Sequence, residues 1–314
     1  MLLETHKYAF EFIAIMELTI LGTSSMVPTK ERNVTAFFIR YKTEGILVDC
    51  GEGTQRQMNI AGINRNKITK ILITHWHGDH VSGLMGLFHT LGNIDGKHKI
   101  SLYGPRGTKN YIKHLLQACF FDVRIDLTVT EIEPHGVEKF FENKDFYLEC
   151  TKMKHGTDCL AYSFVEKDKR KIIKSFLKRN NVPDGPHLKM LQAGKSIVYN
   201  GVKIDVEKAT TVVKGRKVTF ILDTLLNDNC FKIAKDANLL VCEACYTSQL
   251  AHKGEAYQHL TAKEAALIAS RAGVKELILT HFSQRYKSAY EIEEDAKIYF
   301  DNVRVGEDLM RVKF

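Results

Sequence analysis

Four potential metal ligands lie within six residues of this 314-residue chain. They are His75, His77, Asp79 and His80, in the segment HWHGDH. Neutral imidazole nitrogens and carboxylate oxygens are ligands that zinc accepts, and two zinc ions about 3.5 to 4 Å apart can share a bridging hydroxide. Because three histidines and an aspartate in so short a window have few other uses, the spacing indicates a metal centre for hydrolysis rather than a polar surface loop.

The segment ahead of this cluster predicts how the ligands are held. Residues 71–74 form an apolar, β-branched run that is typical of a buried parallel strand. Because side chains two residues apart in an extended chain point the same way, His75 and His77 can bind one ion. Asp79 and His80 follow across a glycine turn and can reach a second ion. In open α/β folds, the ends of parallel strands are where ligand sites form.

Three further residues of ligand type each follow a predicted strand. They are His155 after Phe146–Met153, Asp223 after 218–222 and His281 after Leu277–Thr280. Singly each is weak evidence, but together they complete two sets of ligands that share Asp223. One ion would be bound by His75, His77, His155 and Asp223, and the other by Asp79, His80, Asp223 and His281. Asp49 ends another strand, at 45–48, and would orient a ligating histidine through a hydrogen bond.

The order of these ligands resembles the metallo-β-lactamase superfamily, whose hallmark is H-x-H-x-D-H followed by a distant His, an Asp and a final His. The match extends across almost the whole chain. The resemblance implies an α/β fold, the four-layer αββα sandwich, with a two-metal site at one sheet edge. The resemblance does not identify the reaction, because proteins with this fold include thioesterases, lactamases, oxygen-reducing proteins and nucleases.

Two short segments are similar to one family within that superfamily, tRNase Z, the tRNA 3′-end processing endonuclease. The first is PTKERN at 28–33, which resembles the P-x-K-x-R-N loop that helps this family to sense the tRNA 3′ end. The second is LTHFSQRY at 279–286, around the last ligand. The resemblance implies that the loop contacts substrate through Pro28, Lys30, Arg32 and Asn33.

A basic insertion follows His155. Residues 166–195 hold nine Lys or Arg against three acidic residues, and this net charge of +6 is most of the chain's +8. The pattern at 169–180 predicts an amphipathic helix, with Ile172, Ile173, Phe176 and Leu177 on its apolar face. A basic element of this kind would bind a phosphate backbone, and the binding would weaken steeply as the salt concentration rises. On composition alone, a solvated lysine-rich surface helix remains an equal alternative.

The position of the insertion favours nucleic acid. The tRNase Z family carries a protruding arm with a Gly-Pro element after its third motif and uses it to hold the tRNA elbow. Gly185 and Pro186 match that element, so the resemblance implies that they belong to a tRNA-binding arm at about 166–195.

His259 is the candidate proton donor. It lies in AYQHLTA, where the family has its H-x-T motif, and Glu243 of CEAC stands in the place of the acidic residue that orients it. The resemblance implies that His259 protonates the leaving 3′-oxygen of the tRNA, while Asp79 orients or deprotonates the attacking hydroxide. The alternative for His259 is a position at a helix start, beside the capping residue Thr261.

Composition is consistent with one catalytic domain over residues 16–314. An apolar content of 44% can bury a two-sheet core, and no internal repeat divides the chain. Met16 directly precedes the first predicted strand, so residues 1–15 are interpreted as an N-terminal extension. The pI near 9.0 favours an anionic partner. No run approaches the roughly 18 apolar residues of a membrane span, and no signal peptide is evident, so we predict a cytoplasmic protein that does not enter a membrane.

The seven cysteines are predicted to be reduced and mostly buried, Cys119, Cys150 and Cys242 among them. The pair Cys242-x-x-Cys245 is interpreted as core packing, because no second pair accompanies it. The remaining predicted elements are helices at 54–61, 82–91 and 108–121, a hairpin at 34–48, and capping boxes at Thr261 with Glu264 and Ser288 with Glu291.

These observations favour a zinc-dependent endoribonuclease that removes the 3′ trailer of precursor tRNA and leaves a 3′-hydroxyl. The ligand count implies two Zn²⁺ per subunit, although Mn²⁺ and iron fit the same ligand types. The length suits the short form of the family, which the resemblance implies is a homodimer whose arms each present tRNA to the partner's site.

Rival functions share parts of this pattern. A thioesterase of the hydroxyacylglutathione hydrolase type has the same ligands, but its function would not require a basic arm or the PTKERN loop. A β-lactamase would be exported and commonly has cysteine in its second ligand set, where this chain has Asp79 and His80. A β-CASP nuclease needs a large domain between Asp223 and His281, where only 57 residues lie. A non-enzymatic RNA-binding protein on this fold would be expected to lose ligands.

Overall fold

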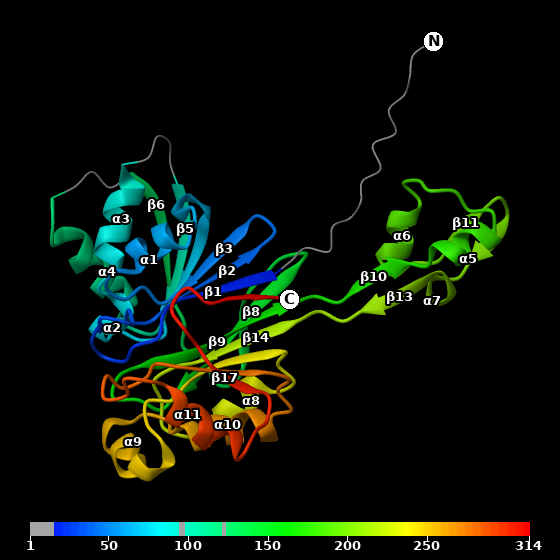
Figure 1. Cartoon of the computed structure of the whole chain (residues 1–314). Helices are drawn as coiled ribbons and strands as arrows, with labels where there is room; N and C mark the ends of the chain where they lie inside the picture. The colour runs from blue at the N-terminus through cyan, green and yellow to red at the C-terminus, as the bar shows by residue number, and fades with distance from the viewer. Residues whose placement is uncertain (1–15, 94–97, 121–123) are drawn as a thin grey trace.

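Two seven-stranded sheets form the centre of the molecule (Figure 1). The computed structural model describes residues 16–93, 98–120 and 124–314, so the predicted extension at 1–15 lies outside the described residues. The first sheet has the order β18-β1-β2-β3-β4-β5-β6, and its strands are β1 (Met16–Gly22), β2 (Ala36–Tyr41), β3 (Glu44–Val48), β4 (Ile68–Leu72), β5 (His98–Gly104), β6 (Ile125–Glu131) and β18 (Arg311–Lys313).

The second sheet is formed mainly by the C-terminal half of the chain. It has the order β17-β16-β15-β14-β9-β8-β7, and its strands are β7 (Glu138–Glu142), β8 (Phe146–Met153), β9 (Cys159–Glu166), β14 (Lys217–Ile221), β15 (Leu239–Glu243), β16 (Leu277–Thr280) and β17 (Val303–Val305). β14, β15 and β16 run parallel, as do β3 and β4 in the first sheet. Ligand-type residues that follow these strands are therefore brought to one edge.

Apolar side chains from both sheets fill the space between them. Phe37 of β2 and Phe220 of β14 are typical, with ring centroids 5.4 Å apart. Tyr162 of β9 is fully buried there, and its hydroxyl donates a hydrogen bond of 2.8 Å to the backbone carbonyl of Ile73. This bond joins the second sheet to the segment that leaves β4, two residues before His75.

Helices cover the outer faces of both sheets. α1 (Thr54–Ile60), α3 (Leu84–Gly92) and α4 (Thr108–Gln117) pack on the first sheet, and α8 (Asp228–Ala234), α10 (Ala262–Arg271) and α11 (Tyr290–Lys297) on the second. The predicted αββα four-layer sandwich is therefore confirmed. In the described part of the chain, no helix combines the length and the apolar character that a membrane crossing requires.

Three predictions about the sandwich differ from the structure. The capping box of Thr261 with Glu264 is present, but the one at Ser288 is absent, because Ala289 is the N-cap of α11 and Ser288 Oγ accepts only from the Tyr290 N–H. α4 ends at Gln117 rather than at 121, and Cys119 beyond it is exposed rather than buried. The other six cysteines are buried, and all seven are free thiols.

A two-stranded ribbon carries a separate small unit away from the sandwich (Figure 1). β10 (Lys169–Ile172) pairs antiparallel with β13 (Thr210–Val213), and the unit between them consists of α5 (Lys174–Arg179), α6 (Leu188–Gln192), β11 (Ile197–Tyr199), β12 (Val202–Ile204) and α7 (Val206–Ala209). We call Lys169–Val213 the arm. It has its own apolar core, which includes Leu177, Leu188 and Leu191.

The predicted helix at 169–180 is wrong over its first turn. Residues 169–172 form β10, and the helix is confined to Lys174–Arg179. The β-branched partner strand Thr210–Val213 supplies the backbone hydrogen bonds, and it lies about forty residues further along the chain. The arm extends past residue 195 and holds ten Lys or Arg against three acidic residues.

Candidate metal centre

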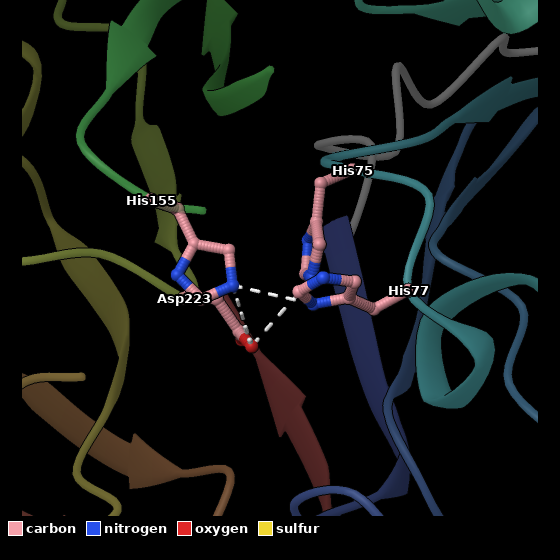
Figure 2. A group of neighbouring side chains, drawn as sticks. All are labelled: His75, His77, His155 and Asp223. Atoms are coloured by element: carbon pink, nitrogen blue, oxygen red, sulfur yellow. Dashed lines mark hydrogen bonds and ion pairs between the residues drawn. The ribbon is translucent and has the colours of Figure 1, made fainter. Parts of the chain in front are cut away.

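Four of the predicted ligands converge at the edge of the sandwich (Figure 2). His75 and His77 follow β4 of the first sheet, whereas His155 follows β8 and Asp223 follows β14 of the second. His75 Nε2 lies 3.6 Å from Asp223 Oδ2, and His77 Nδ1 lies 3.3 Å from His155 Nε2. One ligand atom from each of the four lies within 4.8 Å of the others. The group therefore spans the two sheets and is compact enough to surround one cation.

A second group lies beside the first and consists of Asp79, His80 and His281. α2 (Gly78–Val81) begins within the ligand motif and presents the first two, and His281 follows β16. His281 Nε2 lies 3.3 Å from Asp79 Oδ2 and 3.2 Å from His80 Nε2. Asp223 Oδ1 lies 3.3 Å from His80 Nε2 and 3.2 Å from His281 Nε2. Asp223 thus presents one oxygen to each group, the arrangement predicted for a shared ligand.

The residues present fit metal ions. His75 is fully buried and Asp223 is 2% exposed, yet His75 Nε2 and Asp223 Oδ1 lack a hydrogen-bond partner. Buried polar atoms are rarely left in this state, and one divalent cation in each group would satisfy them. Burial holds the pKa of His75 well below its usual range, and it also lowers the pKa of His155. Both rings are therefore neutral at pH 7 and able to coordinate.

Asp49 lies behind His80, as predicted for a residue that orients a ligand. Its fully buried carboxylate accepts hydrogen bonds from His80 Nδ1 at 2.7 Å and from the backbone N–H of Thr74 at 2.8 Å. This contact leaves His80 Nε2 facing the second group. Burial by itself lowers the pKa of His80, but Asp223, Asp49 and Asp79 outweigh it and raise that pKa well above its usual range. Cation binding there would displace a proton.

His259 and Glu243 form a hydrogen-bonded pair next to these groups. His259 Nδ1 lies 2.8 Å from Glu243 Oε2, while Glu243 Oε1 accepts a bond of 2.6 Å from the backbone N–H of Thr224. Burial lowers the pKa of His259, but Glu243, Cys245 and Asp223 together outweigh it and the pKa rises to about 12. The imidazole therefore contacts Glu243 rather than the start of α10, although it lies two residues before the capping residue Thr261.

The PTKERN loop is held against the segment 279–286 and Asp308. Pro28 and Lys30 are exposed, whereas Arg32 Nη1 donates a bond of 2.8 Å to the carbonyl of Tyr286. The backbone N–H of Asn33 donates to Asp308 Oδ2 at 2.6 Å. Both predicted motifs around the ligands, 28–33 and 279–286, are thus in contact. Gly185 and Pro186 lie in the arm just ahead of α6, remote from the ligands (Figure 1).

Two contacts at the centre were missed by the sequence analysis. The backbone N–H of Met26 donates a bond of 2.8 Å to Asp79 Oδ2, and nothing in the sequence around Met26 indicates it. Cys245 Sγ lies 3.2 Å from His281 Nδ1, although the CxxC pair was interpreted as core packing. Cys242 does pack in the core. The spacing of Glu243 and Cys245, two residues apart at a strand end, was a usable signal, because such side chains share a face.

The fold and the ligand groups define a metallo-β-lactamase fold protein. The metallo-β-lactamase fold protein YhfI from Bacillus subtilis superposes with a TM-score of 0.68 at 17% identity, covering 96% of this chain and 100% of that chain. Human tRNase Z, short form, superposes with a TM-score of 0.70 at 25% identity, covering 94% and 98%.

Sequence comparison identifies the family. A ribonuclease Z from Nanoarchaeum equitans is 34% identical over 299 residues, which are 94% of this chain and 92% of that protein. A family model described as "Anti-Pycsar protein Apyc1" matches residues 16–182. The chain therefore belongs to the ribonuclease Z family and, over residues 16–182, also to the sequence family described as anti-Pycsar protein Apyc1.

Proposed function

We propose that this protein is a tRNA 3′-processing endoribonuclease, which hydrolyses the phosphodiester bond after the discriminator base of precursor tRNA. The observation that carries the proposal is the combination, in a ribonuclease Z family member, of two adjoining ligand groups with the His259–Glu243 pair. Human tRNase Z, which shares the fold over 98% of its length, supports tRNA as the substrate.

The residues that would hold two zinc ions are those of the two ligand groups. They are His75, His77, His155 and Asp223 for one ion, and Asp79, His80, Asp223 and His281 for the other. When bound, zinc supplies an ionised water at neutral pH and neutralises charge on the phosphoryl oxygens. Mn²⁺ can also be bound by histidine and carboxylate ligands of these kinds, although it prefers oxygen.

Side chains of the protein itself would carry out the proton transfers. Asp79 Oδ2, which lies 3.3 Å from His281 Nε2 in the second group, would orient or deprotonate the attacking water. Because Glu243 engages His259 Nδ1, the Nε2–H of His259 is the proton that can be given away. As the bond between phosphorus and the 3′-oxygen breaks, that proton passes to the leaving oxygen, and the tRNA ends in a 3′-hydroxyl.

The arm and the PTKERN loop would bind the rest of the substrate. Eight basic side chains of the arm are exposed, namely Lys171, Lys174, Lys178, Arg179, Lys189, Lys195, Lys203 and Lys208. They suit the phosphate backbone of the tRNA elbow, with Gly185 and Pro186 shaping the arm ahead of α6. Pro28 and Lys30 are exposed and available to the tRNA 3′ end, whereas Arg32 and Asn33 hold the loop in place. A homodimer in the cytoplasm, in which each arm serves the partner's site, completes the proposal.

Cleavage of a trailer-bearing precursor tRNA tests this function directly. The purified protein is incubated with the precursor, with and without a chelator, and the new 3′ end is mapped. We expect cleavage just after the discriminator base, abolished by the chelator, restored by zinc or manganese, and lost in His77→Ala. If the metal-loaded protein leaves the precursor intact but hydrolyses a glutathione thioester, the thioesterase alternative replaces the proposal.

A further inference from the structure

A third cluster of ligand-type side chains lies on the far side of His281. His281 uses Nε2 toward Asp79 and Asp223, while its Nδ1 faces away from them, toward Cys245 and Glu243. Glu243, Cys245, His259 and His281 each offer one atom, and these four atoms lie within 4.8 Å of one another. The cluster shares His281 with the second group but otherwise uses residues that neither group contains.

The spacing in this cluster approaches that of a tetrahedral zinc site. Cys245 Sγ lies 3.2 Å from His281 Nδ1, His259 Nδ1 lies 2.8 Å from Glu243 Oε2, and Glu243 Oε2 lies 3.7 Å from His281 Nδ1. Zinc bonds of about 2.0 Å to nitrogen or oxygen and 2.3 Å to sulfur separate neighbouring ligand atoms by roughly 3.3 to 3.6 Å. Because all four atoms lie within 4.8 Å of one another, side-chain shifts of up to about an ångström would close the cluster around one ion.

The chemistry of the cluster differs from that of the two neighbouring groups. Thiolate sulfur selects soft and borderline cations such as Cd²⁺ and Zn²⁺, whereas Mn²⁺ prefers oxygen ligands. Cys245 is the one sulfur ligand among the three described groups. Glu243, Cys245 and His281 are almost fully buried, and the His259 side chain, 13% exposed, borders the solvent. An ion would therefore enter past His259.

We propose that Glu243, Cys245, His259 and His281 form a third metal site, which binds Zn²⁺ or Cd²⁺ and inhibits the enzyme. Binding requires the Cys245 thiol and the ring nitrogens to release their protons to solvent. The ion would replace the hydrogen bond between His259 Nδ1 and Glu243, so that the imidazole could no longer be held as a proton donor. This inhibitory consequence rests on the proposed function, whereas the binding itself does not.

Cadmium titration tests the site without any RNA. The full chain, in a Cys119→Ser background that removes the exposed thiol, is loaded with two equivalents of Zn²⁺ and then titrated with Cd²⁺. We expect one further equivalent to bind with an ultraviolet sulfur-to-cadmium charge-transfer band. Cys245→Ser and Cys245→Ala should both abolish the band and the extra equivalent. Cys242→Ala, a buried thiol three residues away in the apolar core, should retain them.

Cleavage assays then connect the site to activity. Excess Zn²⁺ should slow precursor cleavage at least about tenfold in the Cys119→Ser protein, and Cys245→Ser should resist it. A charge-transfer band that is absent in the parent protein, or that persists in both Cys245 variants, would overturn the site. Equal zinc inhibition with and without Cys245 would overturn the inhibitory role. A chain that binds the third ion in the titration, but cleaves no precursor when loaded with only two equivalents of Zn²⁺, would contradict the proposed function alone.

Discussion

The Oε2 atom of Glu243 lies 2.8 Å from Nδ1 of His259, and the Glu243 carboxylate is fully buried. This relationship fixes which nitrogen of the imidazole is free to act. Thr224 holds the other carboxylate oxygen through its backbone N–H at 2.6 Å, so Glu243 has one geometry in which to hold the ring. The pair lies outside the two main ligand groups and has the geometry that the proposed proton transfer requires.

Replacing His259 by Ala should slow precursor cleavage by about 10²- to 10⁴-fold, because the leaving oxygen loses its proton donor. Metal content should stay unchanged, since His259 belongs to neither main ligand group. Single-turnover cleavage and elemental analysis of the same preparation measure the two effects. His252→Ala, at an exposed histidine of α9 (Ala251–Tyr257), is the matched control. Loss of bound metal in His259→Ala would contradict the assigned role.

Asp49→Asn should weaken metal binding at the second group by about 10- to 100-fold, because His80 loses the carboxylate that orients it. The first group should keep its affinity. Chelator competition followed by elemental analysis separates the loss of the first metal ion from the loss of the second. Asp126→Asn, an exposed change on β6, should leave both steps in place. Parallel loss of both ions would instead mean that Asp49 supports the whole edge of the sandwich.

The candidate ligands could be predicted from the sequence because most of them lie in one short segment. The strands of the arm could not, because they pair with residues far along the chain. His75, His77, Asp79 and His80 are local, and the strand ahead of them is a continuous apolar run. The β10 segment has a pattern compatible with a helix, and its strand state depends on Thr210–Val213, far along the chain. Long-range pairing of this kind leaves no local signal.

Single contacts at the centre were harder to predict. The interaction of Cys245 with His281 joins residues from two strand ends, and the cysteine sits in a motif whose first member, Cys242, does pack in the core. The end of α4 at Gln117 likewise depends on tertiary context, and it exposes Cys119.

Met26→Gly should leave stability unchanged or raise it by up to about 1 kcal/mol. Met26 has φ 67° and is 75% exposed, so its side chain adds backbone strain without packing. Glycine removes the strain but gains freedom in the unfolded chain, and the two effects nearly offset. Met26→Val should destabilise by about 1 to 2 kcal/mol, because a β-branched residue suits that φ least. Urea unfolding measures both.

Val27 provides the control for that comparison, because it is not among the described residues with positive φ. Val27→Gly should destabilise the protein, since glycine there gains freedom in the unfolded state and removes a half-buried side chain without relieving any strain. Equal destabilisation by Met26→Gly and Val27→Gly would show that the Met26 conformation carries no strain.

Glu166→Gln should reduce stability at pH 7 by about 1 to 3 kcal/mol, and its effect should shrink as pH falls below the unfolded pKa of about 4.3 and through the lower folded value. Glu166 ends β9 at the base of the arm and is 7% exposed. Burial raises its pKa, but hydrogen bonds from Arg216, Lys169 and Tyr41 outweigh that and lower the pKa overall. Because the folded pKa is the lower one, the stabilisation is present above the unfolded pKa and is lost as pH falls through the folded value.

Urea unfolding across pH 3 to 7 would measure this difference. Glu142→Gln, which removes an exposed pairing with Lys167, should change stability much less at every pH. A constant difference between wild type and Glu166→Gln over the whole range would mean that packing, rather than charge, accounts for the effect.

Neutralising one face of the arm should weaken substrate binding without affecting chemistry. Lys174, Lys178 and Arg179 are exposed on α5. Changing all three to Gln should raise KM for precursor tRNA at least about tenfold, and each lost phosphate contact should reduce the salt slope of binding by about 0.7 to 0.9. The kcat for a small chromogenic phosphodiester should be unchanged, because that substrate cannot reach the arm. The same triple change at Lys232, Lys235 and Lys275, all exposed on the sandwich, is the matched control for net charge. If the control raises KM as much as the arm variant does, overall charge attracts the tRNA and the arm has no specific role in holding it.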